Sequence, residues 1–445
     1  MKNISENYKN PIEIAAELGR SFGGLLGEKG IVECKLAYAL KLLPKFTADE
    51  VIRMNQQVLL YWQAGYFKST ILKVFCETVP PHLKPTDLTS MTFEKIFGSI
   101  NEKTGFTVPP VFTNEVKFVK IPELTTVLGQ RDSMKQFANT LNLVLEGERI
   151  SRQTLKLGGD ATDQNQREKL EKEKKKLKDI GVDYDYRVGE LAYTPDVCVL
   201  AGTRPLENTQ FTYLNKSGFF DRYHVIQHRV TDEEASRYFH KDFKLDLEKK
   251  AALTTVNSKL SEVRVSKVLC PTEEFMAPIY DNLEAIVKDE ITETRLELSE
   301  VIPPRLKGNV LRELVGFSFL RTAAENGFNN IIQLEYTNED KKFILDRLPH
   351  FIDFAMDPLI AASFTIKSKT PSKREQCKNV ILNLLKDDEW DESEEVISAV
   401  EHYFLSKSKT ISGALIYLAL GDLKKAGKIL HKHNQYKIAI PEERS

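Results

Sequence analysis

Apolar residues follow two different periods along the first half of the chain, and the order of these periods predicts the fold class. The short runs "QQVLLYW", "VKFVKI", "DVCVLAG" and "RYHVIQHRV" are rich in β-branched and aromatic residues and predict strands. The stretches "KGIVECKLAYALKLLPK" (29–45), "STILKVFCETV" and "DSMKQFANTLNLVLEGE" repeat apolar residues at helical intervals. Strands that alternate with helices predict an α/β fold with a parallel sheet.

The pattern changes after this α/β portion, and it is interrupted once within it. Residues 160–187 form a charged insertion that predicts a solvated helix or a hairpin. From about residue 233 to residue 355 the periodicity is mainly helical. The polar, basic stretch "TIKSKTPSKRE" then predicts a linker. We therefore expect an α/β core over residues 1–232, a helical domain over residues 233–364 and a C-terminal domain over residues 370–445.

The C-terminal domain has the element order of a winged helix. Three helical patterns precede two strand patterns, and "KILHKHNQYKIAI" predicts a hairpin that turns at His433-Asn434-Gln435. Gly427 is expected to end the last helix. Lysines gather around this helix and hairpin, which predicts either contacts with DNA phosphates or a solubilising surface. They are Lys424, Lys425, Lys428, Lys432 and Lys437.

A candidate phosphate-binding loop joins the strand in "QQVLLYW" to the helix that follows it. In the motif GxxxxGK[ST], backbone N–H groups surround the phosphate at a helix N-terminus, the lysine adds charge and the hydroxyl binds Mg²⁺. Here the eight positions read "WQAGYFKS", so Trp62 and Phe67 replace the two glycines. The candidate nucleotide-binding residues are Gly65, Tyr66, Phe67, Lys68, Ser69 and Thr70, with ATP as the nucleotide and Ser69 as the Mg²⁺ ligand.

This loop resembles the nucleotide loop of the minichromosome maintenance (MCM) replicative helicases, a AAA+ family. That family's loop, G-D-P-G-T-A-K-S, has no glycine directly before the lysine, so only Trp62 departs from it at a glycine. The family's later motifs recur in the same order. "VKFVKIPEL" stands where the Walker B strand ends in Ile-Asp-Glu. Pro122 replaces the aspartate, and Glu123 occupies the position of the glutamate that activates water.

Further motifs of the family follow downstream. "LNLVLEGERISRQTLKLG" resembles the helix and strand that enter the pre-sensor-1 hairpin, and "VLAGTRP" resembles sensor 1, with Arg204 at the asparagine position. "SGFFDRYHVI" resembles the motif of the arginine finger and places Arg222 there. "LRELVGFSFLRTAA" resembles the lid helix, for whose sensor-2 arginine Arg305 and Arg312 are both candidates.

The resemblance covers roughly residues 20–440 and implies a AAA+ core with a helical lid and a C-terminal winged helix. No counterpart of the family's N-terminal DNA-encircling domain is expected. The resemblance implies ATP and Mg²⁺ as cofactors, a homo-oligomeric hexameric ring, and action on DNA as a helicase or translocase. Glu123, Arg204 and Arg222 would serve catalysis, with Arg222 acting on the nucleotide of a neighbouring subunit. The lysine run 169–178 would contact the DNA backbone, or else forms a solvated face.

Pro122 also leaves a second function open. It cannot ligate Mg²⁺, so hydrolysis is expected to be slow unless another carboxylate such as Asp132 takes the aspartate's place. An initiator, regulator or scaffold protein that binds nucleotide but hydrolyses it poorly is therefore the alternative, and a protein remodeller without a DNA role is a third. His224 and His228 lie four residues apart, a spacing that would bring their side chains together on a helix. The segment is predicted to be a strand, which keeps these side chains apart, so no metal pair is predicted.

Composition limits the partners and the compartment. The formal net charge of −1 confines any nucleic-acid-binding surface to a local patch. The five scattered cysteines lack metal-ligand or redox spacing and predict reduced thiols. The polar start of the chain and the lack of a long apolar run predict a cytoplasmic protein with no membrane contact, and the resemblance to the helicase family implies association with the nucleoid.

Overall fold

The computed structural model shows two compact units, Met1–Asp357 and Pro358–Ser445. Within the part of the chain that it describes, no helix is long and apolar enough to cross a membrane. The structure describes residues 10–44, 55–83, 85–90, 96, 98–101, 105–108, 111–113, 116–128, 131–153, 164–185, 190–206, 208–291, 304–351, 373–385, 391–406, 411–426, 428–433 and 435–438.

A parallel sheet of five strands forms the centre of the first unit; the sequence patterns predicted four of these strands and missed Pro85–Asp87. The strands are, in spatial order, β10 (His224–Gln227), β1 (Val58–Tyr61), β9 (Cys198–Thr203), β5 (Phe118–Ile121) and β2 (Pro85–Asp87). Leu59 of β1 pairs with Ala201 on one side and with Val225 on the other. Because the strands are parallel, the loops that follow β1, β5 and β9 leave the sheet at the same edge, where ligands bind in open α/β sheets.

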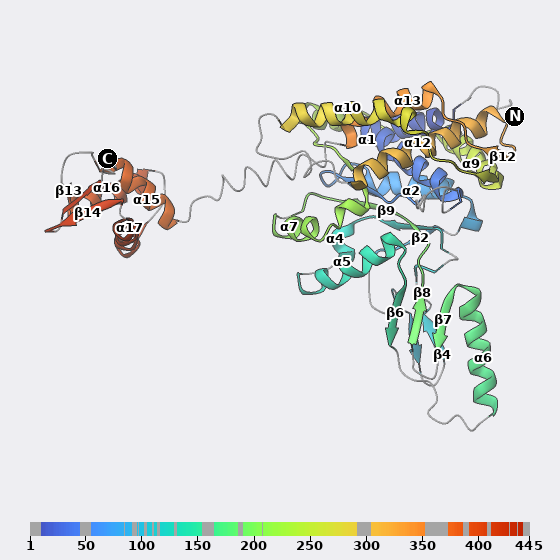
Figure 1. Cartoon of the computed structure of the whole chain (residues 1–445), viewed down its shortest axis with the longest axis horizontal. Helices are drawn as coiled ribbons and strands as arrows, with labels where there is room; N and C mark the ends of the chain where they lie inside the picture. The colour runs from blue at the N-terminus through green and yellow to red at the C-terminus, as the bar shows by residue number, and fades with distance from the viewer. Residues whose placement is uncertain are drawn as a thin grey trace. The chain divides into compact units, whose positions relative to one another are not determined.

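Helices cover both faces of this sheet (Figure 1). Successive strand residues enter opposite cores: Leu60 and Leu200 belong to one, Leu59 and Val199 to the other. The first core contains residues of α1 (Pro11–Leu42), α2 (Lys68–Thr78), α9 (Leu247–Glu262) and α12 (Pro304–Glu325). The second contains residues of α4 (Leu124–Leu128), α5 (Arg131–Glu146) and α7 (Asn208–Lys216). The predicted α/β fold class is confirmed as a three-layer arrangement.

Helix α1 is longer than the helix predicted over residues 29–45, and it bends sharply at Gly24, where φ is 57° and ψ is −139°. The two halves approach so closely that a Cβ on Gly19 would lie 2.3 Å from the carbonyl oxygen of Gly27. Only glycine permits this contact. The half after the bend is buried and carries Lys35, whose ammonium group donates to the Asn257 side chain of α9. Burial lowers the pKa of Lys35 well below its usual value.

A smaller antiparallel layer is inserted between α5 and β9. It consists of β6 (Ile150–Gln153), β7 (Val182–Asp185) and β8 (Glu190–Tyr193), in the order β6-β8-β7. Helix α6 (Gln164–Asp179) packs against β7 and against β4 (Gly105–Val108), which forms a hairpin with β3 (Ser99–Asn101). Of the two structures expected for the charged insertion, a helix or a hairpin, the insertion contains the helix, α6, and the strand β7 follows it.

The chain after β10 is mainly helical, as expected. It contains α8 (Asp232–His240), α9, β11 (Val265–Lys267), α10 (Glu273–Ile291), α12, β12 (Ile331–Gln333) and α13 (Asn338–Leu345). Strands β11 and β12 form a short parallel pair that the helical periodicity does not indicate. Because α9 and α12 pack on α1, this portion belongs to the same compact unit as the sheet.

The second unit has three helices and a three-stranded antiparallel sheet in its described part. The elements are α15 (Lys373–Leu384), β13 (Asp391–Glu392), α16 (Ser393–Ser406), α17 (Gly413–Lys425), β14 (Ile429–Lys432) and β15 (Gln435–Ile438). The predicted hairpin is confirmed, since Lys432 pairs with Gln435 and His433 adopts a positive φ of 49° in the turn between them. Gly427, expected to end α17, lies outside the described residues. Strand β13 has two residues, too few for the alternation of apolar and polar residues by which a strand is predicted from sequence.

Candidate functional site

The loops after β1, β5 and β9 come together at one edge of the parallel sheet. Gly202, near the end of β9, marks this meeting point: a Cβ there would lie 3.0 Å from the carbonyl oxygen of Pro122 and 3.2 Å from Cβ of Lys68. The fold thus places Lys68 next to the Pro122–Glu123 segment and to Thr203. The sequence places these groups more than 50 residues apart.

The loop curls through two residues with positive φ. Gly65 has φ 85° and an open surrounding, whereas Phe67 has φ 59° and ψ −4°, the left-handed conformation. This conformation costs a non-glycine residue about 1–3 kcal/mol. The Phe67 ring offsets that cost by packing against Tyr238 and Phe243, at centroid distances of 5.8 and 5.6 Å. Phe67 therefore adopts the left-handed conformation to which the motif's glycine is suited.

Trp62, which replaces the first glycine of the motif, stabilises the loop through its side chain. Its ring is buried, and its Nε1–H donates to the carbonyl oxygen of Tyr66 at 2.6 Å. This hydrogen bond ties the beginning of the loop to its end. Its indole ring also lies 5.9 Å from Nζ of Lys68, within cation–π range. Trp62 is thus part of the structure that holds the loop curled.

Lys68 begins α2 and turns its ammonium group back toward the loop. Nζ donates to the carbonyl oxygens of Trp62 at 2.8 Å and of Gln63 at 2.7 Å. Burial lowers the pKa of Lys68 to about 8, although the negative charge of Glu123 opposes this shift. Ser69 and Thr70 follow in the first turn of α2 and are exposed. The first turn has no acidic residue and no side-chain cap, so its N–H groups suit an anion.

The lowered pKa of Lys68 predicts a pH effect on phosphate binding. Above about pH 8 the free protein loses the Lys68 proton, whereas a bound phosphate favours the ammonium form. ATP binding is therefore expected to take up close to one proton per site at pH 9, and less than half of one at pH 7. Calorimetry in buffers of different ionisation enthalpy measures this uptake. Equal uptake at both pH values would contradict the assignment.

Glu123 is oriented by two threonine hydroxyl groups. Thr125 Oγ1 donates to its Oε1 at 2.8 Å, and Thr203 Oγ1 lies 3.3 Å from the same oxygen and 3.1 Å from the carbonyl oxygen of Arg204, two acceptors that share its one proton. Thr203 ends β9, so its hydroxyl links the sensor-1 position to the glutamate. From the sequence, Arg204 was the residue expected to act at this position, and no role was predicted for Thr203. The signal that could have indicated it is the unbroken apolar run "CVLAG", typical of a strand buried on both faces, which places Thr203 at the carboxyl end of that strand.

The predicted arginines lie in different surroundings. Arg204 is exposed next to Thr203. Arg222 ends the short helix η3 (Phe220–Arg222) and pairs with Glu146 of α5 at 2.9 Å, so it contacts its own chain and not the loop. Arg312 lies in α12 and donates to Asn309 at 2.9 Å. The side chains of Arg305 and Asp132 are outside the described residues, and the sensor-2 arginine stays open between Arg305 and Arg312.

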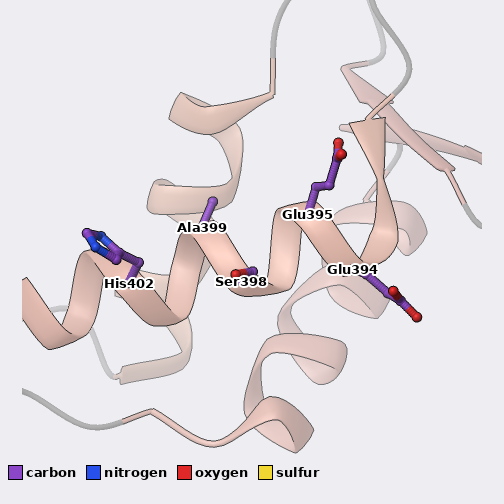
Figure 2. Close-up of a pocket in the computed structure, with 5 residues that line it drawn as sticks. All are labelled: Glu394, Glu395, Ser398, Ala399 and His402. Carbon is purple, nitrogen blue, oxygen red and sulfur yellow. The ribbon is translucent and has the colours of Figure 1, made fainter.

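A shallow hollow lies on α16 of the C-terminal unit (Figure 2). Its lining residues come from one helix: Glu394, Glu395, Ser398, Ala399 and His402. The two carboxylates would repel a phosphate, and Figure 2 shows that they point in different directions. This hollow therefore does not resemble a nucleotide site.

The edge formed by the loop, Glu123 and Thr203 is thus the candidate functional site, and comparisons with known proteins add no family to it. No protein-family model matches this sequence, and no curated protein matches it.

Proposed function

We propose that this protein is an ATP-binding AAA+ ATPase of MCM-like type that acts on DNA as an oligomeric ring. The observation that carries the proposal is the convergence of Lys68, Glu123 and Thr203 at the carboxyl edge of one parallel sheet. The spatial order of the strands supports it as well. Strand β9, which carries the sensor-1 position, lies between the loop strand β1 and the Walker B strand β5, so it can contact both.

The residues at this edge have the chemistry that a triphosphate and Mg²⁺ require. Lys68 and the first N–H groups of α2 would bind the phosphate oxygens, and the exposed Ser69 hydroxyl would ligate Mg²⁺. Mg²⁺ commonly keeps several water ligands and takes others from the phosphates, so one protein hydroxyl is compatible with binding. The Pro122 side chain offers no ligand atom, so we expect this site to bind Mg²⁺ weakly.

Glu123 would orient the water molecule that attacks the γ-phosphate. The oxygen of this water forms a bond to phosphorus while the bond to the β,γ-bridging oxygen breaks, and ADP leaves with that oxygen. Thr125 and Thr203 hold one oxygen of Glu123, which leaves the other available to accept a hydrogen bond from the water. Arg222 would act in a neighbouring subunit, and for this it must first release Glu146 and the carbonyl oxygens of Ser217 and Gly218.

Exposed basic residues support a role on DNA. Helix α6 contains seven basic and four acidic residues, and its exposed lysines include Lys172, Lys175 and Lys178. In the second unit, α17 ends in the exposed Lys424 and Lys425. The earlier turns of α17 expose Ala414, Tyr417 and Leu418, which offer little hydrogen bonding to base edges. The proposed winged helix would therefore contact the DNA backbone without reading sequence.

The alternative function is a nucleotide-binding initiator or scaffold that hydrolyses ATP poorly. Pro122 at the Walker B position favours it, because no carboxylate follows β5 directly to support Mg²⁺. Among the described residues, Glu123 is the carboxylate whose charge acts on Lys68. This alternative predicts tight ATP binding together with negligible turnover of the unmodified protein.

ATP turnover with and without single-stranded DNA tests the proposal. The unmodified protein is expected to hydrolyse ATP faster with DNA, and Glu123→Gln to lower the rate about 10²–10⁴-fold while ATP binding remains. Glu77→Gln, at the surface end of α2, is the matched control and should retain turnover. Arg222→Ala should abolish the turnover of the assembled protein, because this arginine is proposed to act on the nucleotide of a neighbouring subunit. DNA-stimulated hydrolysis that survives both Glu123→Gln and Arg222→Ala would contradict the assigned roles.

A further inference from the structure

Three side chains from distant parts of the sequence meet in the interior of the first unit. Glu33 lies on α1, His224 is the first residue of β10, and Glu313 lies on α12. All three are at least 98% buried. Nε2 of His224 lies 2.8 Å from Oε1 of Glu313 and 3.4 Å from Oε2 of Glu33.

These three facing atoms have no hydrogen-bond partner among the described residues, although each is buried. The short contact between His224 and Glu313 is therefore not aligned as a hydrogen bond. An unpaired buried polar atom destabilises the folded state. All three atoms lie within 4.8 Å of one another, close enough to share one ligand.

Arg347 orients both carboxylates from the opposite side. Its Nε donates to Oε2 of Glu313 at 3.0 Å, and its terminal nitrogen pairs with Oε1 of Glu33. Arg347 thus holds one oxygen of each carboxylate while the other oxygen faces His224, and the Gln56 side chain also interacts with the Glu313 carboxylate. Metal-binding carboxylates are commonly held in this way by a second layer of hydrogen bonds. The Phe351 ring packs on the imidazole at 4.8 Å and gives the cluster an apolar wall.

We infer that Glu33, His224 and Glu313 bind one divalent transition-metal ion, for which Zn²⁺ is the best fit. One imidazole nitrogen and two carboxylate oxygens form a ligand set that Zn²⁺ accepts, whereas Mg²⁺ and Ca²⁺ prefer oxygen ligands alone. The ion supplies the positive partner that the three converging atoms lack. His228 does not belong to the site, since it pairs with Glu234 at 3.0 Å.

The position of this site makes it a structural link between α1, α12 and the sheet. His224 pairs with Val58, the first residue of β1, whereas the phosphate loop follows the last residue of β1. The two sites are therefore separated by the length of that strand, about 10 Å. The metal site is independent of the proposed ATPase function, and either can fail without the other.

Metal binding by the full-length protein tests the inference. After dialysis against a chelator, the protein is titrated with Zn²⁺, and with Co²⁺ as a visible-absorption probe of the ligand geometry. We expect one ion per chain and a rise of the thermal midpoint by about 5 °C or more at saturation. His224→Ala is expected to weaken binding at least about 100-fold, and Glu33→Gln, which preserves the side-chain shape, at least about 10-fold. His228→Ala is the matched control and should bind as the unmodified protein does.

Two results would overturn the inference. If the unmodified protein binds neither ion and its midpoint does not respond to them, the cluster is completed by a shared proton. If a Zn²⁺ ion remains bound with unchanged affinity in folded His224→Ala, the ion lies elsewhere. Because the first result needs no variant, the test stands even if His224→Ala fails to fold.

Discussion

Replacing Lys68 with alanine is expected to weaken ATP binding about 10- to 100-fold and to remove measurable turnover. The Lys68 ammonium group lies at the N-terminus of α2, held by the carbonyl oxygens of Trp62 and Gln63, where a phosphate would enter. A hydrogen bond between charged groups contributes about 1.5–3 kcal/mol, and each 1.4 kcal/mol changes affinity about tenfold. Titration with a fluorescent ATP analogue measures the loss of affinity.

Lys73→Ala is the matched control for this experiment, because Lys73 lies on the same helix and is exposed. It should bind ATP as tightly as the unmodified protein. Thermal unfolding of both variants separates a loss of binding from a loss of fold. Affinity of a folded Lys68→Ala variant within about threefold of the unmodified protein would exclude the loop as a phosphate site.

Replacing Arg321 with methionine is expected to lower the free energy of unfolding of the first unit by about 3–5 kcal/mol. Arg321 joins α12 to α13: Nε and a terminal nitrogen donate to the two carboxylate oxygens of Asp340 at 2.9 and 3.0 Å. Asp340 is fully buried. Methionine keeps the apolar stem but leaves this carboxylate without its positive partner. Urea unfolding monitored by circular dichroism measures the change.

Arg237→Met is the control for charge removal at the surface. Arg237 pairs with Glu233 on α8, and their side chains are 74% and 88% exposed. Water screens such a pair, so the expected change is at most about 0.5 kcal/mol. If Arg321→Met cost no more than Arg237→Met, the buried pair would not stabilise this part of the fold.

Local sequence patterns were sufficient for four of the five strands of the central sheet, whereas the three-residue strand β2 is too short to show a pattern. The runs around Val58 and Phe118 are short, apolar and bounded by polar or turn residues, and each forms a strand. Lys68 follows the first strand at the start of a helix, so sequence order alone indicated the loop. Such features depend on neighbours a few residues away, which the sequence displays directly.

The local pattern failed where a contact between distant segments decides the conformation. The bend of α1 at Gly24 depends on the close approach of Gly19 and Gly27. Helical periodicity does not record such an approach. The left-handed conformation of Phe67 depends on Tyr238 and Phe243, whose rings lie beside it only in the folded chain.

The sequence by itself determined the α/β class and the order of four of the five strands of the parallel sheet, and it indicated Lys68, Ser69 and Glu123 as candidate groups. It could do so because strand and helix periods, and the position of a lysine after a strand, are properties of short segments. Only the tertiary structure decided that Thr203 holds Glu123 and that Glu33, His224 and Glu313 meet in the core. These groups are brought together by strand pairing and helix packing, which act between residues far apart along the chain.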